Sequence, residues 1–459
     1  MSSLHNCSAT RWALSVGFMQ LAEGVSRKLV RRLWKPGLGG IPHILIRISP
    51  NASGCEKPQS GIGSLPISRP LMYLERVEKV GACENASGEE RLMGVEEKAG
   101  ATREIEAWES LCEDLKGVGR RLLATAPDDP LDRAEGLRYL ARLSSVFLGM
   151  MTSDPVPPRQ PLLSQAMKVG LDNPDYAYCR ATLDPRFRYV LSGDLGDARS
   201  LGIGTFSGNL GSSEGLIRDG YVETGDLVFA PDGRFALSIS LEEQEGNWLP
   251  MKPATNSLQV RQVLTRRREE RPATLELQKL EDKRIPPPLD PERFLGSLAG
   301  MPAILEGIVG QFLGWTAHFR THLHEIQPIP DELIAFAQGD PATSYNYSYW
   351  ELGPQEALVI EFMPPICDYW NLQIGNHWLE SLDYFHRNTH VNQQTVVLGK
   401  DGSARIIVAR RDPGVPNWLD TAGHARGGLA LRWVGAAQNP TTHCRVVPVD
   451  SLRSAASPG

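Results

Sequence analysis

The sequence predicts a mainly β protein with helical additions, in which two related jelly-roll or β-sandwich units arise from an internal duplication. Two hairpins carry this prediction, because alternating apolar residues flank an Asp-Gly turn at Asp232-Gly233 and another at Asp401-Gly402. About fifteen residues after each turn comes the triplet Asn-Trp-Leu, at Asn247–Leu249 and at Asn417–Leu419. The matching order and spacing indicate two units of the same design.

The strands that follow the triplets also match. LQVRQVL in the first half and LALRWVG in the second half place Arg261 opposite Arg432. Several short strands with turn signals at close spacing are typical of sandwiches and jelly rolls. We therefore expect Trp248 and Trp418 to be equivalent core residues, each preceded by an asparagine that satisfies loop backbone groups.

Helical patterns precede and separate the two β units. After residue 101, Ile105, Trp108 and Leu111 recur at three- and four-residue steps, which is typical of an amphipathic helix. A second helix follows, with Asp129 or Asp132 as its cap. The predicted organisation is an extension at 1–100, a helical segment at 101–170, a first β unit at 171–285, a helical connector at 286–340 and a second β unit at 341–453.

The first hundred residues differ in composition from the rest. Residues 1–50 hold seven Lys or Arg and a single acidic residue, Glu23, and the stretch that follows is rich in Gly, Pro and Ser without a sustained period. A basic, acid-poor start is typical of a transit peptide. A disordered tail, or sequence upstream of the true start, fits the same composition. We expect no folded domain here.

Composition narrows the class of protein. With 459 residues, 41% of them hydrophobic and 22% charged, the chain can bury a sizeable core. A net charge of −6 is unlike that of nucleic-acid-binding proteins, which concentrate positive charge. The seven cysteines include no CxxC pair, which favours reduced thiols and a cytoplasmic location. No apolar run reaches the ~18 residues of a membrane span.

Three stretches of the second half carry a resemblance to a known family. DYWNLQIGNHWLESLDY, DPGVPNWLDTAGH and LRWVGA resemble the bacterial family called domain of unknown function twelve-fourteen, which often occurs with family twelve-fifty-four. The resemblance covers about residues 101–449. It implies a β-rich, jelly-roll-like fold with helical additions, and it implies no reaction.

The stretch from Asp412 to His424 contains the first candidate site. Asp420 and His424 follow the second Asn-Trp-Leu triplet and have no counterparts after the first one. A carboxylate can orient an imidazole for general acid–base work, and Gly423 would let the two approach. Alternatively, Asp420 caps a turn and His424 is a polar residue at the rim.

The stretch NHWLESLDYFHRNTH supplies further candidates. Glu380 and Asp383 are three residues apart, so a helix or tight turn would place them on one face. Paired carboxylates suit acid–base chemistry, although a solvated turn beside aromatic core residues fits as well. His386 and His390 have the spacing of a metal pair but no evident third ligand, so we expect no metal. The residues expected to bind substrate are Tyr369, Trp370, Trp378, Tyr384 and Arg432.

Two functional hypotheses follow. The first is a soluble, cofactor-free hydrolase, lyase or isomerase for a small, partly apolar molecule, with its pocket in the C-terminal β unit and with Asp420, His424, Glu380 and Asp383 as catalytic residues. The alternative is a non-catalytic module that binds a glycan or another ligand, or that assembles. The aromatic alternation of YNYSYW, from Tyr345, favours the alternative, since aromatic planes bind sugar rings. A homo-oligomer is compatible with both hypotheses.

Overall fold

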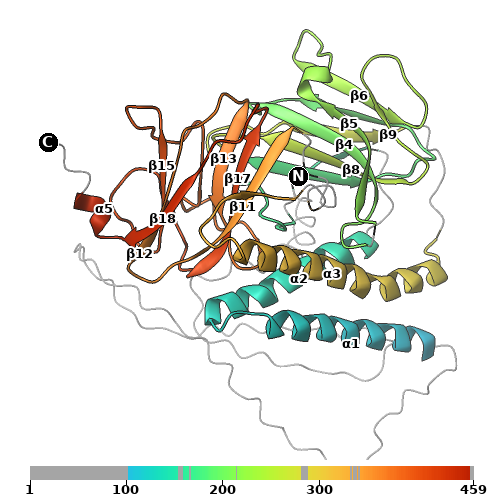
Figure 1. Ribbon diagram of the computed structural model, residues 1–459. Coiled ribbons are helices and arrows are strands. Elements are labelled where there is room, and N and C mark those ends of the chain that lie inside the picture. Colours follow the sequence, from blue (N-terminus) through green and yellow to red (C-terminus); the bar gives the residue numbers. More distant parts are fainter. Residues whose placement is uncertain are drawn as a thin grey trace, which may run out of the picture. The chain divides into compact units, whose positions relative to one another are not determined.

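A computed structural model of the chain describes residues 102–152, 159–164, 167–212, 214–280, 288–330, 333, 339 and 342–454. The expected extension at 1–100 lies outside the described residues. The protein is mainly β with helical additions, as the sequence predicts, and its described strands form four sheets (Figure 1). The described helices are α1 (Thr102–Ala124), α2 (Pro130–Thr152), α3 (Pro291–Arg320) and α5 (Ser451–Ser454).

The helices form because apolar residues recur at helical spacing and polar groups cap their ends. Asp129 accepts hydrogen bonds from the backbone N–H groups of Leu131 and Asp132, at 2.8 Å and 3.2 Å, and so caps α2. In α1 the buried face begins only at Leu111, whereas Ile105 and Trp108 are exposed, contrary to the sequence pattern. The spacing of apolar residues predicts which face of α1 is apolar. It does not predict at which residue α3 begins to cover that face.

The first β unit is a sandwich of two sheets. One sheet has the order β1-β9-β3-β6-β7 and the other β2-β8-β4-β5. Its strands are β1 (Arg159–Pro161), β2 (Tyr176–Thr182), β3 (Tyr189–Asp194), β4 (Ser200–Gly208), β5 (Leu216–Glu223), β6 (Arg234–Ser240), β7 (Trp248–Pro250), β8 (Thr255–Val263) and β9 (Thr274–Lys279).

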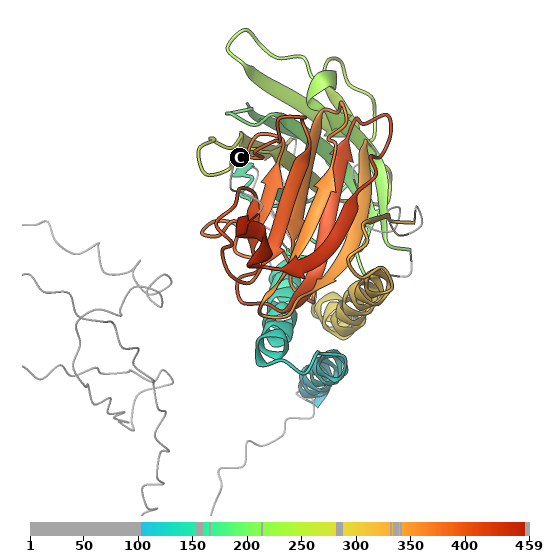
Figure 2. The ribbon, with the colours of Figure 1, turned by 60° about the vertical axis from the view of Figure 1, so that its left-hand side comes forward.

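The second β unit repeats this plan. Its sheets have the orders β16-β15-β12-β18 and β10-β11-β17-β13-β14. Figure 2 shows the orange and red strands of this unit side by side. Its strands are β10 (Gln327–Pro328), β11 (Thr343–Glu351), β12 (Glu356–Phe362), β13 (Tyr369–Ile374), β14 (His390–Asn392), β15 (Ala404–Ala409), β16 (Trp418–Asp420), β17 (Arg426–Val434) and β18 (His443–Pro448). Apart from the short strands β1 and β10, each strand has a counterpart in the same place.

The repeat extends to single hydrogen bonds. Asn247 donates to the carbonyls of Val228 and Ala236, at 2.8 Å and 3.0 Å, and its side-chain oxygen accepts from Val228 N–H. Asn417 makes the same three bonds to residues 397 and 405, at the same distances. The predicted duplication is therefore confirmed at the corner that each asparagine closes.

The two tryptophans are equivalent but are not core residues. Trp248 in β7 pairs with Ser238 of β6, and Trp418 in β16 pairs with Ile407 of β15, both in parallel register. Both side chains are only half-buried, so the expectation that they fill the core is wrong. The leucine that follows each of them points inward and is fully buried, because neighbouring residues of a strand face opposite sides.

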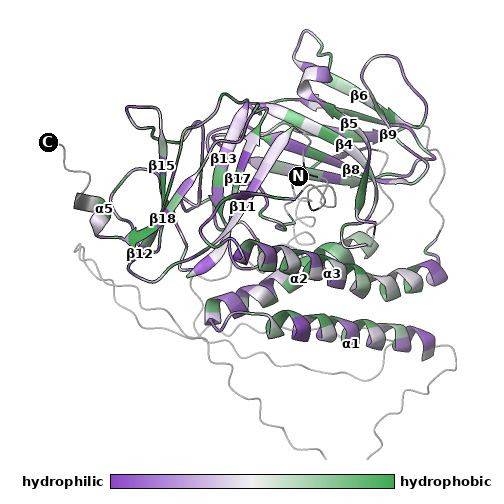
Figure 3. Cartoon of the chain, in the orientation of Figure 1, coloured by the Kyte–Doolittle hydropathy of each residue, from purple (hydrophilic) through white to green (hydrophobic). Residues whose placement is uncertain are grey.

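The outer faces of two sheets are covered rather than solvated. The inner face of β11-β17-β13 packs Trp350, Trp370 and Trp433 into the core of the second sandwich. Its outer face places Tyr347 and Tyr349 in a separate core with α1, α2 and α3. Figure 3 shows β11 and β13 in pale and purple shades, whereas β12 is green. Polar and aromatic side chains therefore lie between the sheet and the helices.

A short segment before β2 ties the first unit to the second. Asp175, which is fully buried, accepts hydrogen bonds from the Tyr369 hydroxyl at 2.6 Å and from the Asn392 amide at 3.0 Å, and it contacts His390 at 3.0 Å. Two residues earlier, Asn173 accepts from the Asn371 amide at 2.7 Å. These bonds join the start of the first sandwich to strands of the second.

Helix α3 has the length and apolar composition of a membrane span, which sets it apart from the other described helices. In the structure Met301, Leu305, Ile308 and Phe319 of this helix are buried in the core shared with α1, α2 and β11. A core helix of a soluble protein meets the same criteria. The expected absence of a membrane span therefore stays a prediction.

Candidate functional site

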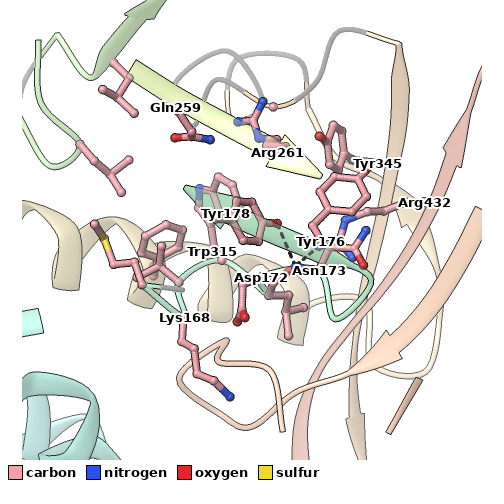
Figure 4. A pocket seen from close by; sticks show the side chains of 18 of the residues that line it. Lys168, Asp172, Asn173, Tyr176, Tyr178, Gln259, Arg261, Trp315, Tyr345 and Arg432 are labelled. Carbon is pink, nitrogen blue, oxygen red and sulfur yellow. Dashed lines mark hydrogen bonds between the residues drawn. The ribbon is translucent and has the colours of Figure 1, made fainter. Parts of the chain in front are cut away.

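A cavity of about 140 Å³ lies where the outer faces of the two units meet α3 (Figure 4). Strands β2 and β8 of the first unit and strands β11 and β17 of the second unit contribute to its wall. The segment at 167–173 and helix α3 complete it. The cavity therefore depends on both repeats and on the helical connector. We call it the first cavity.

Arg432 is the most deeply buried charge in this wall. Its side chain on β17 is only 4% exposed. One end of the guanidinium donates to Gln373 Oε1 at 2.7 Å, and the other donates to the carbonyl oxygen of Leu171. Both acceptors are neutral, and within the described part of the chain no carboxylate lies within ion-pair distance of this arginine. A buried cation without a counter-charge is costly, so an anion in the cavity would complete the site.

Two further arginines of the first unit face the same space. Side chains two residues apart in a strand point to the same side, so Tyr178 and Arg180 of β2 share one face of the sheet. On the paired strand β8, Arg261 lies opposite Tyr178 and Gln259 lies opposite Arg180. When the Gln259 amide oxygen faces Arg261, it accepts from Nε at 3.0 Å and from Nη2 at 2.9 Å. The amide then holds the guanidinium in one orientation.

The positive charges reinforce one another. The Arg180 side chain remains exposed to solvent, but the atoms packed around its guanidinium, and then the charge of neighbouring Arg261, lower the pKa of Arg180 to about 10. The guanidinium still carries its proton at neutral pH, because that value lies well above 7. Three arginines around one small cavity create a positive potential that favours carboxylate, phosphate or sulfate groups.

Tyrosines line the space beside these cations. The Arg432 guanidinium lies 6.0 Å from the ring of Tyr345 and 5.9 Å from the ring of Tyr347. Burial raises the pKa of Tyr178 to about 12, so its phenol stays neutral. The Tyr178 hydroxyl accepts from the backbone N–H of Asn173 at 3.1 Å and can donate its own proton to a ligand oxygen.

The opposite side of the cavity is apolar. Phe312 and Trp315 of α3 meet edge to face, with ring centroids 5.2 Å apart. Gly170, at φ +61°, lets the chain pass against Phe312, because a Cβ there would lie 2.7 Å from the ring. The other apolar side chains of the wall are Met167, Val169, Leu171, Leu210, Leu216 and Ile329. The cavity thus has a cationic end and an aromatic, aliphatic end.

Two charged residues near the rim are engaged elsewhere. Asp172 accepts from the backbone N–H of Ser381 at 3.0 Å and from its hydroxyl at 2.9 Å. Lys168 donates to the carbonyl oxygen of Ser381 at 2.8 Å, and Figure 4 shows it extending away from Arg261 and Arg432. Lys168 adds a further positive charge, and Asp172 forms no ion pair with the three arginines among the described residues.

The expected pairing of Asp420 with His424 is wrong. Asp420 binds Arg387 at 2.6 Å and accepts from the backbone N–H of Ala422 at 2.8 Å, so it caps the turn. His424 Nε2 instead contacts Glu135 of α2 at 2.7 Å, while its Nδ1 contacts the carbonyl oxygen of Thr421 at 2.8 Å. His424 is buried, whereas the alternative expectation placed it at a rim.

The two other expected catalytic carboxylates also lie apart. Glu380 is buried, forms an ion pair with Arg142 of α2 and accepts from the Asn376 amide at 2.9 Å. The same amide donates to Glu135 at 2.7 Å, so Glu380 belongs to a polar cluster that fastens α2 to the second unit. Asp383 is half-exposed and contacts His386 Nδ1 at 3.0 Å. The two side chains do not share a pocket.

The expected aromatic walls are mostly core residues. Trp370 packs against Phe362 and Trp433 inside the second sandwich. Trp378 donates from its indole to the carbonyl oxygen of Asp132 at 2.7 Å and so anchors α2. Neither lines the first cavity, nor does Tyr384, which lies beneath the guanidinium of Arg267. Of the expected binding residues, Arg432 alone lines it, and Tyr369 lines a neighbouring one described below.

Comparison with known proteins yields one informative relative. An uncharacterized protein from Burkholderia cenocepacia, whose crystal structure is known, is 38% identical to this chain and superposes with a TM-score of 0.72. The match covers 77% of this chain and 100% of that one. The chain belongs to the family of this Burkholderia protein. That relative supports the same fold and brings no activity with it.

The remaining comparisons add little. A protein from Vibrio parahaemolyticus is 14% identical, with a TM-score of 0.39, over 60% of this chain and 90% of its own. No family model matches the chain. No curated protein matches it either. Membership of the twelve-fourteen family therefore stays a prediction.

Sequence reasoning missed Arg180, Tyr178, Gln259 and the apolar side supplied by α3. A signal for part of this set was present. Tyr178 and Arg180 alternate with the inward residues Ala177 and Cys179 on β2, and Gln259 and Arg261 alternate on β8 in the same way. Alternation of this kind is also typical of a solvated outer face of an antiparallel sheet, so it marks these residues as outward-facing without showing that another element covers them.

Proposed function

We propose that the protein binds a small amphipathic anion in the first cavity. The observation that carries the proposal is Arg432, a buried guanidinium whose described partners are neutral oxygens and which lines a cavity together with two more arginines. A ligand that carries a carboxylate, phosphate or sulfate group would supply the missing negative charge. Its remainder would be aromatic or aliphatic, to match Phe312 and Trp315.

An enzyme that uses the expected catalytic residues has less support. Asp420, His424 and Glu380 are held by Arg387, Glu135 and Arg142, and none of them lines the first cavity. The binding hypothesis therefore takes precedence over acid–base catalysis. The cytoplasmic location, the homo-oligomer and the glycan as ligand stay predictions.

Calorimetric titration tests the proposal. Phenyl phosphate and benzoate should bind the full-length protein, whereas benzyl alcohol, which has the ring but no charge, should not. Arg180→Gln should weaken binding at least about tenfold, which corresponds to about 1.4 kcal/mol for one charge-assisted contact. Arg234→Gln, at an exposed position of β6, is the matched control and should leave affinity unchanged. Equal binding of the charged and the neutral compounds would rule out the proposal.

A further inference from the structure

A second cavity of about 240 Å³ adjoins the first one. Both units contribute to it as well, since Tyr221 of β5 and Ser200 of β4 face Tyr369 and Val434 of the second unit across it. Tyr176 and Arg261 line both cavities. The two spaces therefore border on the same phenol and the same guanidinium.

Strand register explains why Arg261 serves both cavities. Arg261 on β8 lies opposite Tyr178 of β2 on one side and opposite Gly202 of β4 on the other. Arg261, Tyr178 and Gly202 are all on the outer face of the sheet β2-β8-β4-β5, because directly paired residues face the same side of a sheet. The first cavity lies towards β2 and the second towards β4, so Arg261 is central.

Glycine at position 202 keeps the second cavity in its present form. A Cβ at Gly202 would lie 2.3 Å from the Tyr221 hydroxyl, so only glycine allows this phenol to lie over β4. The Tyr221 ring is held from the other side by the guanidinium of Arg218, 5.1 Å from its centroid. Tyr221 thus lies beside Arg261 in the lining of the second cavity.

The wall of the second cavity is aromatic and polar. Tyr176 lies 6.1 Å from Tyr369, centroid to centroid, and Tyr221 completes a set of three phenols. Arg199 donates to the carbonyl oxygen of Asp368 at 2.6 Å, and Asp368 and Glu223 each add a carboxylate to the lining. This lining suits a ring-bearing or hydroxylated group, in contrast to the aliphatic end of the first cavity.

We propose that the ligand spans both cavities, with its anionic group at Arg261 and one substituent on each side. This inference rests on the proposed function and narrows its ligand class. Carboxylates, sulfate esters and phosphate monoesters end a molecule, because they carry a single substituent. A phosphodiester or a diphosphate carries a substituent on both sides and keeps its negative charge. Among unbranched anions, an amphipathic phosphodiester is the simplest one that fits, with an apolar group in the first cavity and a polar ring in the second.

Two synthetic diesters test this assignment by calorimetry on the full-length protein. Diphenyl phosphate and methyl phenyl phosphate both carry one negative charge and differ only in the second ring. Diphenyl phosphate should bind at least about tenfold more tightly. Tyr221→Ala should abolish that advantage and leave methyl phenyl phosphate unaffected. Tyr345→Ala, which alters the first cavity alone, should weaken both diesters alike.

The outcomes separate the inference from the proposal on which it rests. Equal affinities of the two diesters for the unaltered protein would overturn the extended site while binding in the first cavity stands. That comparison needs no variant, so it holds even if Tyr221→Ala fails to fold. If neither diester binds and phenyl phosphate does not bind either, the proposed function fails, and this inference fails with it.

Discussion

Arg261 and Arg432 occupy the seventh position of two equivalent nine-residue strands, β8 and β17, and both line the first cavity. The residues paired with them correspond too, since Tyr178 lies opposite Arg261 and Tyr345 lies opposite Arg432. The duplication thus brings two copies of one Tyr–Arg pair to a single space. The Tyr–Arg pair, which both halves contain, therefore contributes twice to the lining of the first cavity.

The first prediction concerns the repulsion between the arginines. Arg180→Met removes a charge that lies close to Arg261, so the ligand-free protein should gain roughly 0.5 kcal/mol in free energy of unfolding. The gain should shrink in 0.5 M salt, since added ions screen the repulsion. Urea unfolding at low and high salt measures both effects. A loss of stability at low salt would show that Arg180 supports the fold.

The second prediction concerns Asp132, whose carboxylate oxygens have no hydrogen-bond partner among the described residues. Burial, and then the charge of Asp129, raise the pKa of Asp132 from 3.8 to about 6. The folded protein therefore holds this proton more tightly than the unfolded chain, and stability falls as the pH rises from about 4 to about 6. The pKa of Asp132 differs by about two units between the folded and the unfolded state, and each unit corresponds to about 1.4 kcal/mol. The free energy of unfolding is therefore lower by roughly 3 kcal/mol above pH 7.

Asp132→Asn should remove this penalty. The variant should be more stable than the unaltered protein at pH 7.5, by up to roughly 3 kcal/mol, and the difference should be about half as large at pH 5. Asp128→Asn, at an exposed position nearby, is the control and should change little at either pH. Thermal unfolding at the two pH values decides the matter. A difference independent of pH would exclude titration of Asp132 as the cause.

The third prediction compares two residues of the C-terminal corner. His424→Leu removes one charge-assisted hydrogen bond from the buried Glu135 carboxylate, which keeps Arg138 and Asn376 as partners, and should cost roughly 1.5–3 kcal/mol. Asp420→Asn disrupts a pair whose arginine, Arg387, is half-exposed, and should cost less than about 1 kcal/mol. Urea unfolding near neutral pH gives both values. Similar losses in the two variants would contradict the structural difference between the two contacts.

The His424 contribution should also depend on pH. Burial alone would lower the pKa of His424, but the hydrogen bond and the charge of Glu135 raise it above its usual value. The folded state thus binds this proton more tightly, so the stabilisation is complete below about pH 6.5 and is lost as the pH rises through the raised pKa. The gap between His424→Leu and the unaltered protein should therefore narrow at pH 9.

The fourth prediction uses the repeated corner. Asn247→Ala and Asn417→Ala each break three equivalent hydrogen bonds and should each cost roughly 2 kcal/mol. Asn417 also has φ +58°, a left-handed backbone that alanine adopts less readily, so its variant should lose about 1 kcal/mol more. Unfolding of the two single variants and of the double variant should show additive effects. Strong coupling would contradict two separate corners.

The sequence is sufficient to predict the fold, because each hairpin, each Asn-Trp-Leu corner and each following strand carries its own local signal. Its failure at Asp420 and His424 has a physical cause. The partner of His424 is Glu135, which is 289 residues away on α2, and no local spacing reports that contact. The residues close to His424 in the sequence therefore do not include the partner of its Nε2 atom.

Part of the candidate site can be predicted from the sequence. The match between Arg261 and Arg432 is visible in the aligned strands, but a repeated residue is as typical of shared architecture as of function, so the match does not identify Arg261 as a site residue. The apolar side of the first cavity cannot be predicted from the sequence, because Phe312 and Trp315 have ordinary helical spacing and could equally fill a core. Only the packing of α3 over both units shows that a space remains there.

The bonds of Asp175 have a consequence for the history of the chain. A duplicated domain is at first a pair of autonomous copies, and either copy can be lost or moved. Here the entry segment of the first copy satisfies its buried carboxylate with Tyr369, Asn392 and His390 of the second copy. Neither half, produced alone, would retain a complete set of partners for its buried polar groups. The two copies have become mutually dependent, and evolution can now act on them only as one inherited unit.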